Sequence, residues 1–440
     1  MTDEPKSMLG DYLDRLESTP TVKFRGRVRE VTGLVVKASI PEGAVGDLVT
    51  VSTRDGKGRL AEIVGFERDN AVLMPLGEVD GIGLDSEVDA TGRNFEIRCG
   101  DDLLGRVLDG LGEPVDGGPA LRGEPWSVNR AAPHPLTRRR IERPLALGIR
   151  AIDGLLTIGD GQRVGLFAGS GVGKSTLLGQ IARASDADVN VICLVGERGR
   201  EVRDFIEDSL GPEGLARSVV VCATSDAPSL VRLKSAWVAT SIAEWFRDRD
   251  RRVLLLMDSV TRFARAQREV GLAAGEPPAR RGFPPSVFSM LPRLLERAGT
   301  SDRGSITGIY TVLVAGGDFE EPIADEVRGI LDGHIVLSRD LANRNHWPAI
   351  DVLPSLSRVM AAIVSSDHRF AAAEFRTLLA AYEARRDLIA LAAYEYGTDD
   401  ITDRAIDMIE DLEAFLRQGM HESTPFDATL DSMLDLVGFP

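Results

Sequence analysis

The chain has 440 residues, of which 27% are charged, and a formal net charge of −16. This composition is typical of a folded, water-soluble protein of several domains and excludes a disordered or collagen-like chain. The acidic excess also argues against a general nucleic-acid binder, which needs a basic surface to neutralise phosphates. We therefore expect no nucleic acid among its partners.

No apolar run approaches the roughly 18 residues of a membrane span. The first residues lack the basic and apolar pattern of a signal peptide. The 3 cysteines are widely spaced and predict neither a disulfide framework nor a zinc site. We therefore expect a protein of the reducing cytoplasm.

The acidic excess is concentrated towards the C-terminal end. Residues 361–440 contain 16 Asp and Glu against 6 Arg, so this segment carries −10 of the total −16. A charge so unevenly distributed indicates a property of one domain rather than of the whole chain.

Residues 1–20 are predicted to be a short polar lead-in, helical in part. Residues 21–93 contain short runs rich in Val and Ile, separated by turn signals such as Thr32-Gly33 and Asp69-Asn70. Strands of this length and spacing predict a small all-β barrel or sandwich.

Residues 94–361 alternate continuous apolar runs with amphipathic segments. Parallel strands need such runs when helices cover both faces of their sheet. The alternation therefore predicts an α/β domain with right-handed crossovers. The predicted strands are residues 164–167, 189–195, 219–222, 253–257 and 310–314.

Residues 362–440 lack strand signals and show helical apolar spacing over 370–396 and 401–416. This zone is predicted to be a helical domain. Its helix ends are predicted from a terminating Gly397, from a capping Asp399 or Asp400, and from a starting Thr424-Pro425.

The most specific motif is Ala-Gly-Ser-Gly-Val-Gly-Lys-Ser-Thr at residues 168–176, between a predicted strand and a predicted helix. This context predicts a P-loop, in which backbone N–H groups and a helix N-terminus converge on phosphate oxygens. Lys174 is expected to reach the β- and γ-phosphates, and the Ser175 hydroxyl to bind Mg²⁺. The strict pattern begins with Gly, where this chain has Ala168. The expected nucleotide-binding residues of the loop are Gly169, Ser170, Gly171, Val172, Gly173, Lys174, Ser175 and Thr176.

Two carboxylates, Glu197 and Asp258, follow predicted strands. The carboxyl ends of parallel strands share one edge of a sheet, so both should face the same crevice as the P-loop. Glu197 is then a candidate to polarise the attacking water, and Asp258 to hold Mg²⁺ or its water. Taken alone, Glu197 would be a solvated loop charge and Asp258 a helix cap.

Several segments together resemble the flagellar and type III secretion export ATPases, relatives of the catalytic subunit of rotary ATP synthases. The resemblance extends from about residue 25 to the end of the chain. It implies a homohexameric ring ATPase whose subunit has a β-barrel, a RecA-like nucleotide domain and a helical C-terminal domain. The family's P-loop also commonly begins with Ala. The segments that carry the resemblance are residues 168–176, 196–202, 258–269, 282–288, 291–299, 328–339 and 347–351.

The resemblance assigns catalytic roles to individual residues. It implies that Lys174 and Ser175 bind phosphate and Mg²⁺, that Glu197 is the catalytic carboxylate and that Asp258 is the Walker-B residue. It further places two arginines at the catalytic site, Arg198 and Arg262.

The resemblance also implies two site residues that are far from the P-loop in the sequence. Arg358 matches the arginine finger that a neighbouring subunit supplies, and its alternative is a surface salt bridge. Trp347 stands where the family usually has Tyr and is expected to stack on adenine, its alternative being a buried core residue.

The implied function is Mg²⁺-dependent ATP hydrolysis that drives chaperone release, unfolding and export of protein substrates through a type III secretion apparatus. An injectisome is favoured over a flagellum. The implied partners are other copies of the chain, stalk and stator-like regulators, the membrane export gate and substrate–chaperone complexes. The implied location is the cytoplasmic face of the inner membrane.

Three alternatives remain open at this point. The first is the catalytic subunit of a rotary ATP synthase or vacuolar-type ATPase. The second is an RNA-dependent hexameric helicase, which is disfavoured because residues 21–92 contain only Phe24 and Phe66 as aromatics and no basic cluster. The third is a non-catalytic ring subunit, which the presence of Lys174, Glu197 and Asp258 argues against.

Overall fold

The computed structural model describes residues 25–314 and 318–438, so the predicted lead-in lies outside the described residues. The chain divides into two compact units, the first ending at Phe95 and the second beginning at Glu96.

The first unit is a closed barrel of strands in the order β1-β2-β5-β4-β3-β6. Its apolar side chains alternate into the interior, where Val36, Val49 and Leu73 are fully buried. The predicted turn after Thr32 is present, and Gly33 adopts a φ of +59° there, a conformation that favours glycine. The predicted β-barrel is thus confirmed. The strands are β1 (Arg25–Thr32), β2 (Val35–Ser39), β3 (Leu48–Ser52), β4 (Gly58–Glu67), β5 (Asn70–Pro75) and β6 (Glu87–Ala90).

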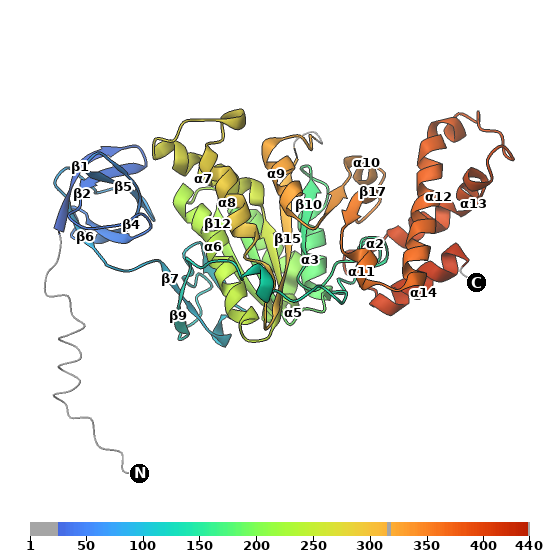
Figure 1. Cartoon of the computed structure of the whole chain (residues 1–440), viewed down its shortest axis with the longest axis horizontal. Helices are drawn as coiled ribbons and strands as arrows, with labels where there is room; N and C mark the ends of the chain where they lie inside the picture. Colours follow the sequence, from blue (N-terminus) through green and yellow to red (C-terminus); the bar gives the residue numbers. More distant parts are fainter. Residues whose placement is uncertain (1–24, 315–317, 439–440) are drawn as a thin grey trace, which may run out of the picture. The chain divides into compact units, whose positions relative to one another are not determined.

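The second unit is built on a sheet in the order β17-β16-β10-β15-β13-β11-β12-β8, with β14 paired to β15 (Figure 1). Along this order every neighbouring pair from β16 to β8 is parallel, which confirms the α/β prediction, whereas β14 runs antiparallel to β15. All predicted strands are present, although the last begins earlier, at Ser305. The strands are β8 (Val107–Asp109), β10 (Arg163–Ala168), β11 (Val189–Glu197), β12 (Ser218–Thr224), β13 (Arg252–Asp258), β14 (Gly299–Thr300), β15 (Ser305–Leu313), β16 (Gly333–Leu337) and β17 (Ile350–Ser357). A separate antiparallel pair consists of β7 (Glu96–Cys99) and β9 (Glu124–Ser127).

The edge strand β17 departs from the expected parallel arrangement, because it runs antiparallel to β16. The connection between them contains only the short helix α10 (Arg339–Asn343). So short a connection returns the chain at the same end of the sheet, whereas a parallel pair needs a longer crossover.

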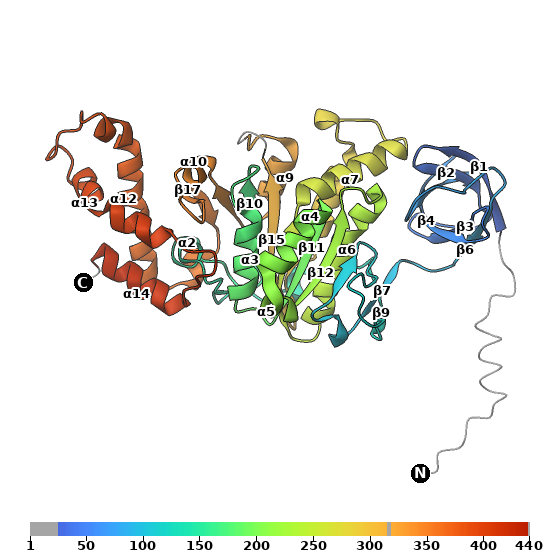
Figure 2. The ribbon, with the colours of Figure 1, turned by 180° about the vertical axis from the view of Figure 1, so that it is seen from behind.

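Helices cover both faces of the sheet. On the face seen in Figure 1 lie α6 (Ser229–Arg247), α7 (Val260–Ala273) and α8 (Pro285–Leu295). On the face seen in Figure 2 lie α3 (Lys174–Ala184), α4 (Gly199–Asp204), the π-helical turn η3 (Phe205–Leu210) and α5 (Gly211–Ala216). The remaining short elements are η1 (Asp101–Leu103), η2 (Pro135–Thr137), α2 (Arg150–Leu155), η4 (Arg280–Gly282), α9 (Pro322–Ile330) and α11 (Met360–Ile363).

The C-terminal helices are α12 (Ser366–Ala390), α13 (Asp400–Leu416) and α14 (Phe426–Val437). They share one continuous apolar core with the nucleotide domain. The contact passes through α2, where a Cβ on Gly154 would lie 3.3 Å from Phe415 and 3.4 Å from Met433. No helix in the described ranges combines the length and the apolar character that crossing a membrane requires.

One predicted helix end was wrong. The helix expected to continue to Gly397 ends at Ala390, and Ala392 takes a left-handed φ of +52°. Leu391 is 78% exposed, so an extended helix would have no core to bury its apolar side chains. Gly397 lies in the connection to α13, where its N–H donates to Asp403. The cap by Asp399 is confirmed, because its side chain accepts a hydrogen bond from the Ile401 N–H.

A fully buried ion pair ties α6 to the segment after α8. The side chains of Arg297 and Glu244 are 1% and 0% exposed, and Arg297 Nη2 lies 2.5 Å from Glu244 Oε2. The same guanidinium donates to the Val128 carbonyl and the Ser241 hydroxyl, each at 2.9 Å. Every donor group of this arginine that is described thus has a partner in the core.

We predict that Arg297→Met lowers the free energy of unfolding by about 3–5 kcal/mol, because it leaves the Glu244 carboxylate buried without its partner. Urea unfolding followed by circular dichroism measures the change. Arg386→Met, which removes the part-exposed pair with Glu383, serves as control and should cost less than about 1 kcal/mol. Equal losses in the two variants would contradict the prediction.

Candidate active site

The P-loop lies between β10, which ends at Ala168, and α3, which begins at Lys174. Gly171 and Gly173 have φ angles of +79° and +77°, which L side chains rarely adopt. A Cβ on Gly173 would also lie 2.7 Å from the Trp347 ring. The loop therefore needs glycine at Gly173 for two independent reasons.

The other loop residues are placed as a P-loop requires. Ser175 is exposed at the start of α3, Thr176 is half-buried and Val172 is 2% exposed. The carbonyl of Ser170 lies within 3.5 Å of Arg339 Nη2, the first residue of α10. Arg339 was not predicted, since it reaches the loop only because β16 pairs in parallel with β10 and places Leu337 opposite Ala168.

The two predicted carboxylates meet at the carboxyl edge of the sheet. Because β11 and β13 pair in parallel, with Leu194 opposite Asp258, Glu197 and Asp258 lie close together. Lys174 Nζ contacts Asp258 Oδ1 and lies 3.6 Å from Glu197 Oε1. The structure thus brings Lys174, Glu197 and Asp258 into one cluster.

A threonine holds the Walker-B carboxylate from behind. Thr311 Oγ1, on the neighbouring strand β15, donates to Asp258 Oδ1 at 2.8 Å. The hydroxyl is fully buried and has the Met257 carbonyl as a further partner. The sequence pattern could not single out this threonine, because it stands inside an ordinary apolar strand.

Arg262 joins the cluster and Arg198 does not. Arg262 Nη2 lies 2.9 Å from Glu197 Oε2, and its Nη1 donates to the Gly196 carbonyl. The side chain of Arg198 is 79% exposed and lies 3.5 Å from Glu201 Oε1. Arg262 therefore orients Glu197, while Arg198 extends into solvent at the rim of the site.

The electrostatics of Glu197 follow from its neighbours. Burial and the nearby Asp258 charge raise its pKa to about 7, against the opposing effect of Lys174. Its hydrogen bond to Glu201 helps hold the pKa of Glu201 below the usual range. Glu201 is a further residue of this site that the sequence pattern did not identify.

Trp347 lies against the P-loop and is 37% exposed, so it is not a buried core residue. Its ring faces Gly173, and its Nε1 donates to Asn345 Oδ1 at 2.9 Å. The N–H of Gln418, just after α13, donates to its carbonyl at 2.8 Å. An exposed indole beside the P-loop is positioned to contact a bound base.

Arg358 lies at the opposite end of the sheet from the other predicted site residues. Its N–H donates to the Asp332 carbonyl, and Asp332 bonds to Arg163 at the start of β10. The P-loop follows the other end of β10, which at about 3.3 Å per residue is about 17 Å away. Arg358 therefore cannot complete the phosphate site of its own chain.

Comparison with known proteins agrees with this geometry. The nucleotide-binding domain of the ATP synthase alpha/beta family matches residues 148–357, and the β-barrel domain of that family matches residues 28–92. The T3SS EscN ATPase C-terminal domain matches residues 364–435.

Curated relatives match almost the whole chain. A type 3 secretion system ATPase of Xanthomonas euvesicatoria is 54% identical over 98% of both chains. A flagellum-specific ATP synthase of Bacillus subtilis is 50% identical over 97% of this chain and 98% of its own. The chain belongs to the family of type 3 secretion system and flagellum-specific ATPases. It is therefore a P-loop ATPase, and the resemblance inferred from the sequence is confirmed.

Solved structures of this family share the fold. The assembled ATPase EscN from the type III secretion system of enteropathogenic E. coli has a TM-score of 0.88 at 46% identity. It covers 94% of this chain and 100% of its own. EscN has also been solved in complex with its central stalk EscO, with a TM-score of 0.87 at 47% identity and the same coverage.

We predict that Thr311→Val lowers the ATPase turnover number about tenfold, because Asp258 loses a hydrogen bond that fixes its carboxylate. Steady-state ATP hydrolysis measures the change. Thr240→Val, which removes a buried hydroxyl bonded to the Ala236 carbonyl within α6, is the matched control and should leave turnover unchanged. A similar loss of turnover in both variants would refute a specific role for Thr311.

Proposed function

We propose that this ATPase works with Mg²⁺ as a homohexameric ring that drives chaperone release, unfolding and export of protein substrates through a type III secretion apparatus. The observation that supports a ring is that Arg358 and Lys174 lie at opposite ends of one sheet. A chain that holds the two halves of a site at opposite ends needs a second copy at each end. We favour an injectisome because a type 3 secretion relative is 54% identical and because the T3SS EscN ATPase C-terminal domain matches residues 364–435.

The P-loop binds the nucleotide phosphates in this proposal. Backbone N–H groups of residues 169–173 and the N-terminus of α3 face the phosphate oxygens, and Lys174 neutralises the β- and γ-phosphates. Trp347 stacks on the adenine with its exposed ring. When phosphate enters, Lys174 exchanges its contact with Asp258 for contacts to ATP.

The residues present fit Mg²⁺. Ser175 offers an exposed hydroxyl, and Asp258 keeps its Oδ2 clear of Lys174 and Thr311, which both bind Oδ1. Mg²⁺ favours such a site, with one or two protein oxygens beside substrate phosphates and water. When bound, the ion would neutralise charge on the phosphates.

Glu197 orients the attacking water and accepts its proton. Arg262 fixes the Glu197 carboxylate through Oε2, which leaves Oε1 towards Lys174 and the phosphate position. The pKa of Glu197 is raised towards neutral pH, and a general base is most effective when its pKa lies near the operating pH. Arg198 lies at the exposed rim, where it can contact the nucleotide only by leaving Glu201.

We expect Glu197→Gln to retain ATP binding and to lower the turnover number by about 10²–10⁴-fold, because the amide cannot accept the proton. Fluorescent-nucleotide titration and steady-state hydrolysis measure the two effects separately. Glu410→Gln, an exposed position of α13, is the control for the loss of one charge. Turnover near the wild-type level in E197Q would rule out the assigned role.

Arg358 acts in trans, as a finger that stabilises the transition-state charge in the neighbouring subunit. Removing such a finger typically lowers turnover by about 10³–10⁵-fold. We predict that Lys174→Ala and Arg358→Ala are each inactive and that their mixture recovers activity. In a mixed ring, an intact Lys174 of one chain meets an intact Arg358 of its neighbour.

ATP hydrolysis by the premixed variants checks this complementation. The control is a mixture of K174A with E197Q. Both substitutions lie on the nucleotide-binding side of the interface, so no pair of neighbouring subunits forms a complete site. Recovery in the control, or none in the K174A and R358A mixture, would refute the finger in trans.

We propose that the other partners are stalk and stator-like regulators, the membrane export gate and substrate–chaperone complexes, with the ring at the cytoplasmic face of the inner membrane. The acidic C-terminal segment supports such contacts, since −10 of the charge lies in residues 361–440. A surface of one sign attracts partners of the opposite sign over long range.

A further inference from the structure

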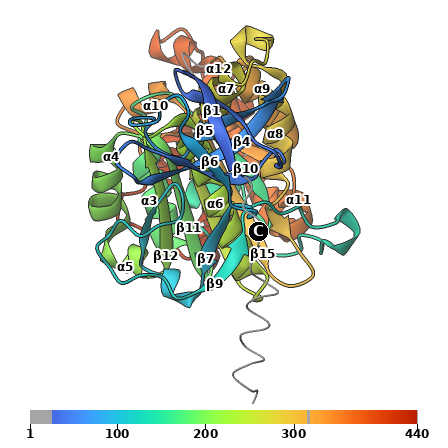
Figure 3. The same cartoon turned by 90° about the vertical axis from the view of Figure 1, so that its left-hand side faces the viewer.

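The second compact unit presents two functional faces. The P-loop and the carboxyl ends of the parallel strands form what we call the nucleotide face. Arg358 and the opposite strand ends form the finger face. Helix α10 follows β16 on the nucleotide face, and α11 follows Arg358 on the finger face; Figure 3 shows these two helices well apart.

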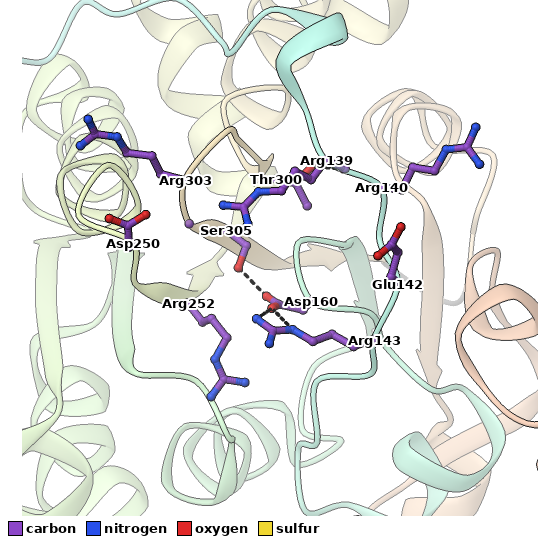
Figure 4. Close-up of a pocket in the computed structure, with 11 residues that line it drawn as sticks. Arg139, Arg140, Glu142, Arg143, Asp160, Asp250, Arg252, Thr300, Arg303 and Ser305 are labelled. Atoms are coloured by element: carbon purple, nitrogen blue, oxygen red, sulfur yellow. Dashed lines mark hydrogen bonds and ion pairs between the residues drawn. The ribbon is translucent and has the colours of Figure 1, made fainter.

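The finger face contains an arginine-lined cavity of about 750 Å³ (Figure 4). Residues 138–143, which we call the arginine arm, form one wall of it. The starts of β13 and β15 form another. The arginines that line it are Arg139, Arg140, Arg143, Arg252 and Arg303, against the carboxylates of Glu142, Asp160 and Asp250.

Two of these arginines are already paired. Arg143 Nη2 lies 2.7 Å from Asp160 Oδ2, and Arg252 Nη1 lies 3.1 Å from Asp186 Oδ2. Arg139 donates only to the Ser301 carbonyl, at 3.1 Å, and Arg140 has no hydrogen-bond or ion-pair partner among the described residues. Figure 4 shows Arg140 extending away from the cavity. The arm therefore carries positive charge that its own chain leaves unpaired.

The arm belongs to the same face as the finger. A Cβ on Gly159 would lie 2.2 Å from Ile141 of the arm and 3.4 Å from Val359, the residue after Arg358. Asp160, the next residue, holds Arg143. A subunit that receives Arg358 must therefore also come close to the arm.

The complementary charge lies on a segment that starts at the nucleotide face and runs along α3 towards the start of β12. This segment of α4, η3 and the start of α5, residues 199–213, carries five carboxylates and two arginines. Among the described residues, Asp204 and Glu207 pair only with Arg200 and Arg203 on the same surface, and these side chains are more than half exposed. Such exposed pairs contribute little and exchange partners readily. Asp208 has no ion-pair partner among the residues described. We call residues 199–213 the acidic surface.

We propose that the arginine arm docks on the acidic surface of a second copy of this chain and so aligns Arg358 with that copy's P-loop. The inference rests on the proposed ring, and it adds the surface that sets the register between neighbours. The contact is heterologous, with a different face from each copy, and repeated contacts of this kind close a ring. In this proposal the arm and the acidic surface meet at the rim of the interface between subunits. There their opposite charges select the partner face and raise the rate of association.

A charge-swap experiment tests the proposal. Arg139→Glu with Arg140→Glu reverses the arm, and Glu207→Arg with Asp208→Arg reverses the acidic surface. All four side chains are exposed, and none belongs to the ATP site. Each double variant alone would oppose like charges at every interface. Their equimolar mixture would alternate two attractive interfaces, reversed arm with reversed surface and native arm with native surface.

We expect each variant alone to need at least about tenfold more protein than the wild type for half-maximal ATPase activity. For the mixture, this protein concentration should lie within about twofold of the wild-type value. Mass photometry follows the rings, and hydrolysis against protein concentration follows their activity. Asp431→Arg with Asp435→Arg on α14 is the charge-matched control and should assemble as wild type.

Three outcomes would overturn the inference. Either double variant alone could assemble like the wild type. The mixture could also assemble no better than either variant alone. The arm variant could also assemble normally but lose binding of tripolyphosphate that the wild type shows, which would make the cavity an anion site. A wild-type chain that hydrolyses ATP fully as a monomer would instead refute the proposed ring itself, which distinguishes the two failures.

Discussion

The catalytic edge depends on one balance of buried charge. The ammonium of Lys174 lies between the carboxylates of Glu197 and Asp258, whose side chains are only 8% and 4% exposed. Without the lysine, two carboxylates would face each other in a site that excludes water, which is costly. The glycine loop, the parallel strands and the buried Thr311 hydroxyl all serve to bring and hold these charges together.

The same sheet separates the two halves of the chemistry. Parallel strands place every carboxyl end at the nucleotide face, and the antiparallel return of β17 carries Arg358 back to the opposite end. In the ring that we propose, a single chain therefore holds a phosphate site without its arginine finger, and a finger without a phosphate site. On this proposal the topology of the fold makes assembly necessary, and the charges of the arginine arm and the acidic surface would set its direction.

The C-terminal helices are continuous with the core of the nucleotide domain rather than loosely attached. Their apolar side chains join the same cluster as α2 and α3. Gln418 bonds to Trp347 beside the P-loop. The segment that holds Trp347 beside the P-loop is therefore in direct contact with the helices that carry most of the acidic excess. This contact gives nucleotide binding a physical route to the surface that we propose meets the partners.

Periodicity and a glycine-rich loop are local properties, so the three zones, the P-loop and the positions of Glu197 and Asp258 could be predicted from the amino-acid sequence alone. It also supplied Arg262 and Arg358 through the family resemblance. Three features needed the folded chain to be seen. Thr311 and Arg339 contact the site, the helix before Gly397 ends early, and Arg358 lies far from Lys174. These features depend on which strands are neighbours, on the direction of β17 and on whether a core is present to bury a side chain. Distant segments decide such matters, and no local pattern records them.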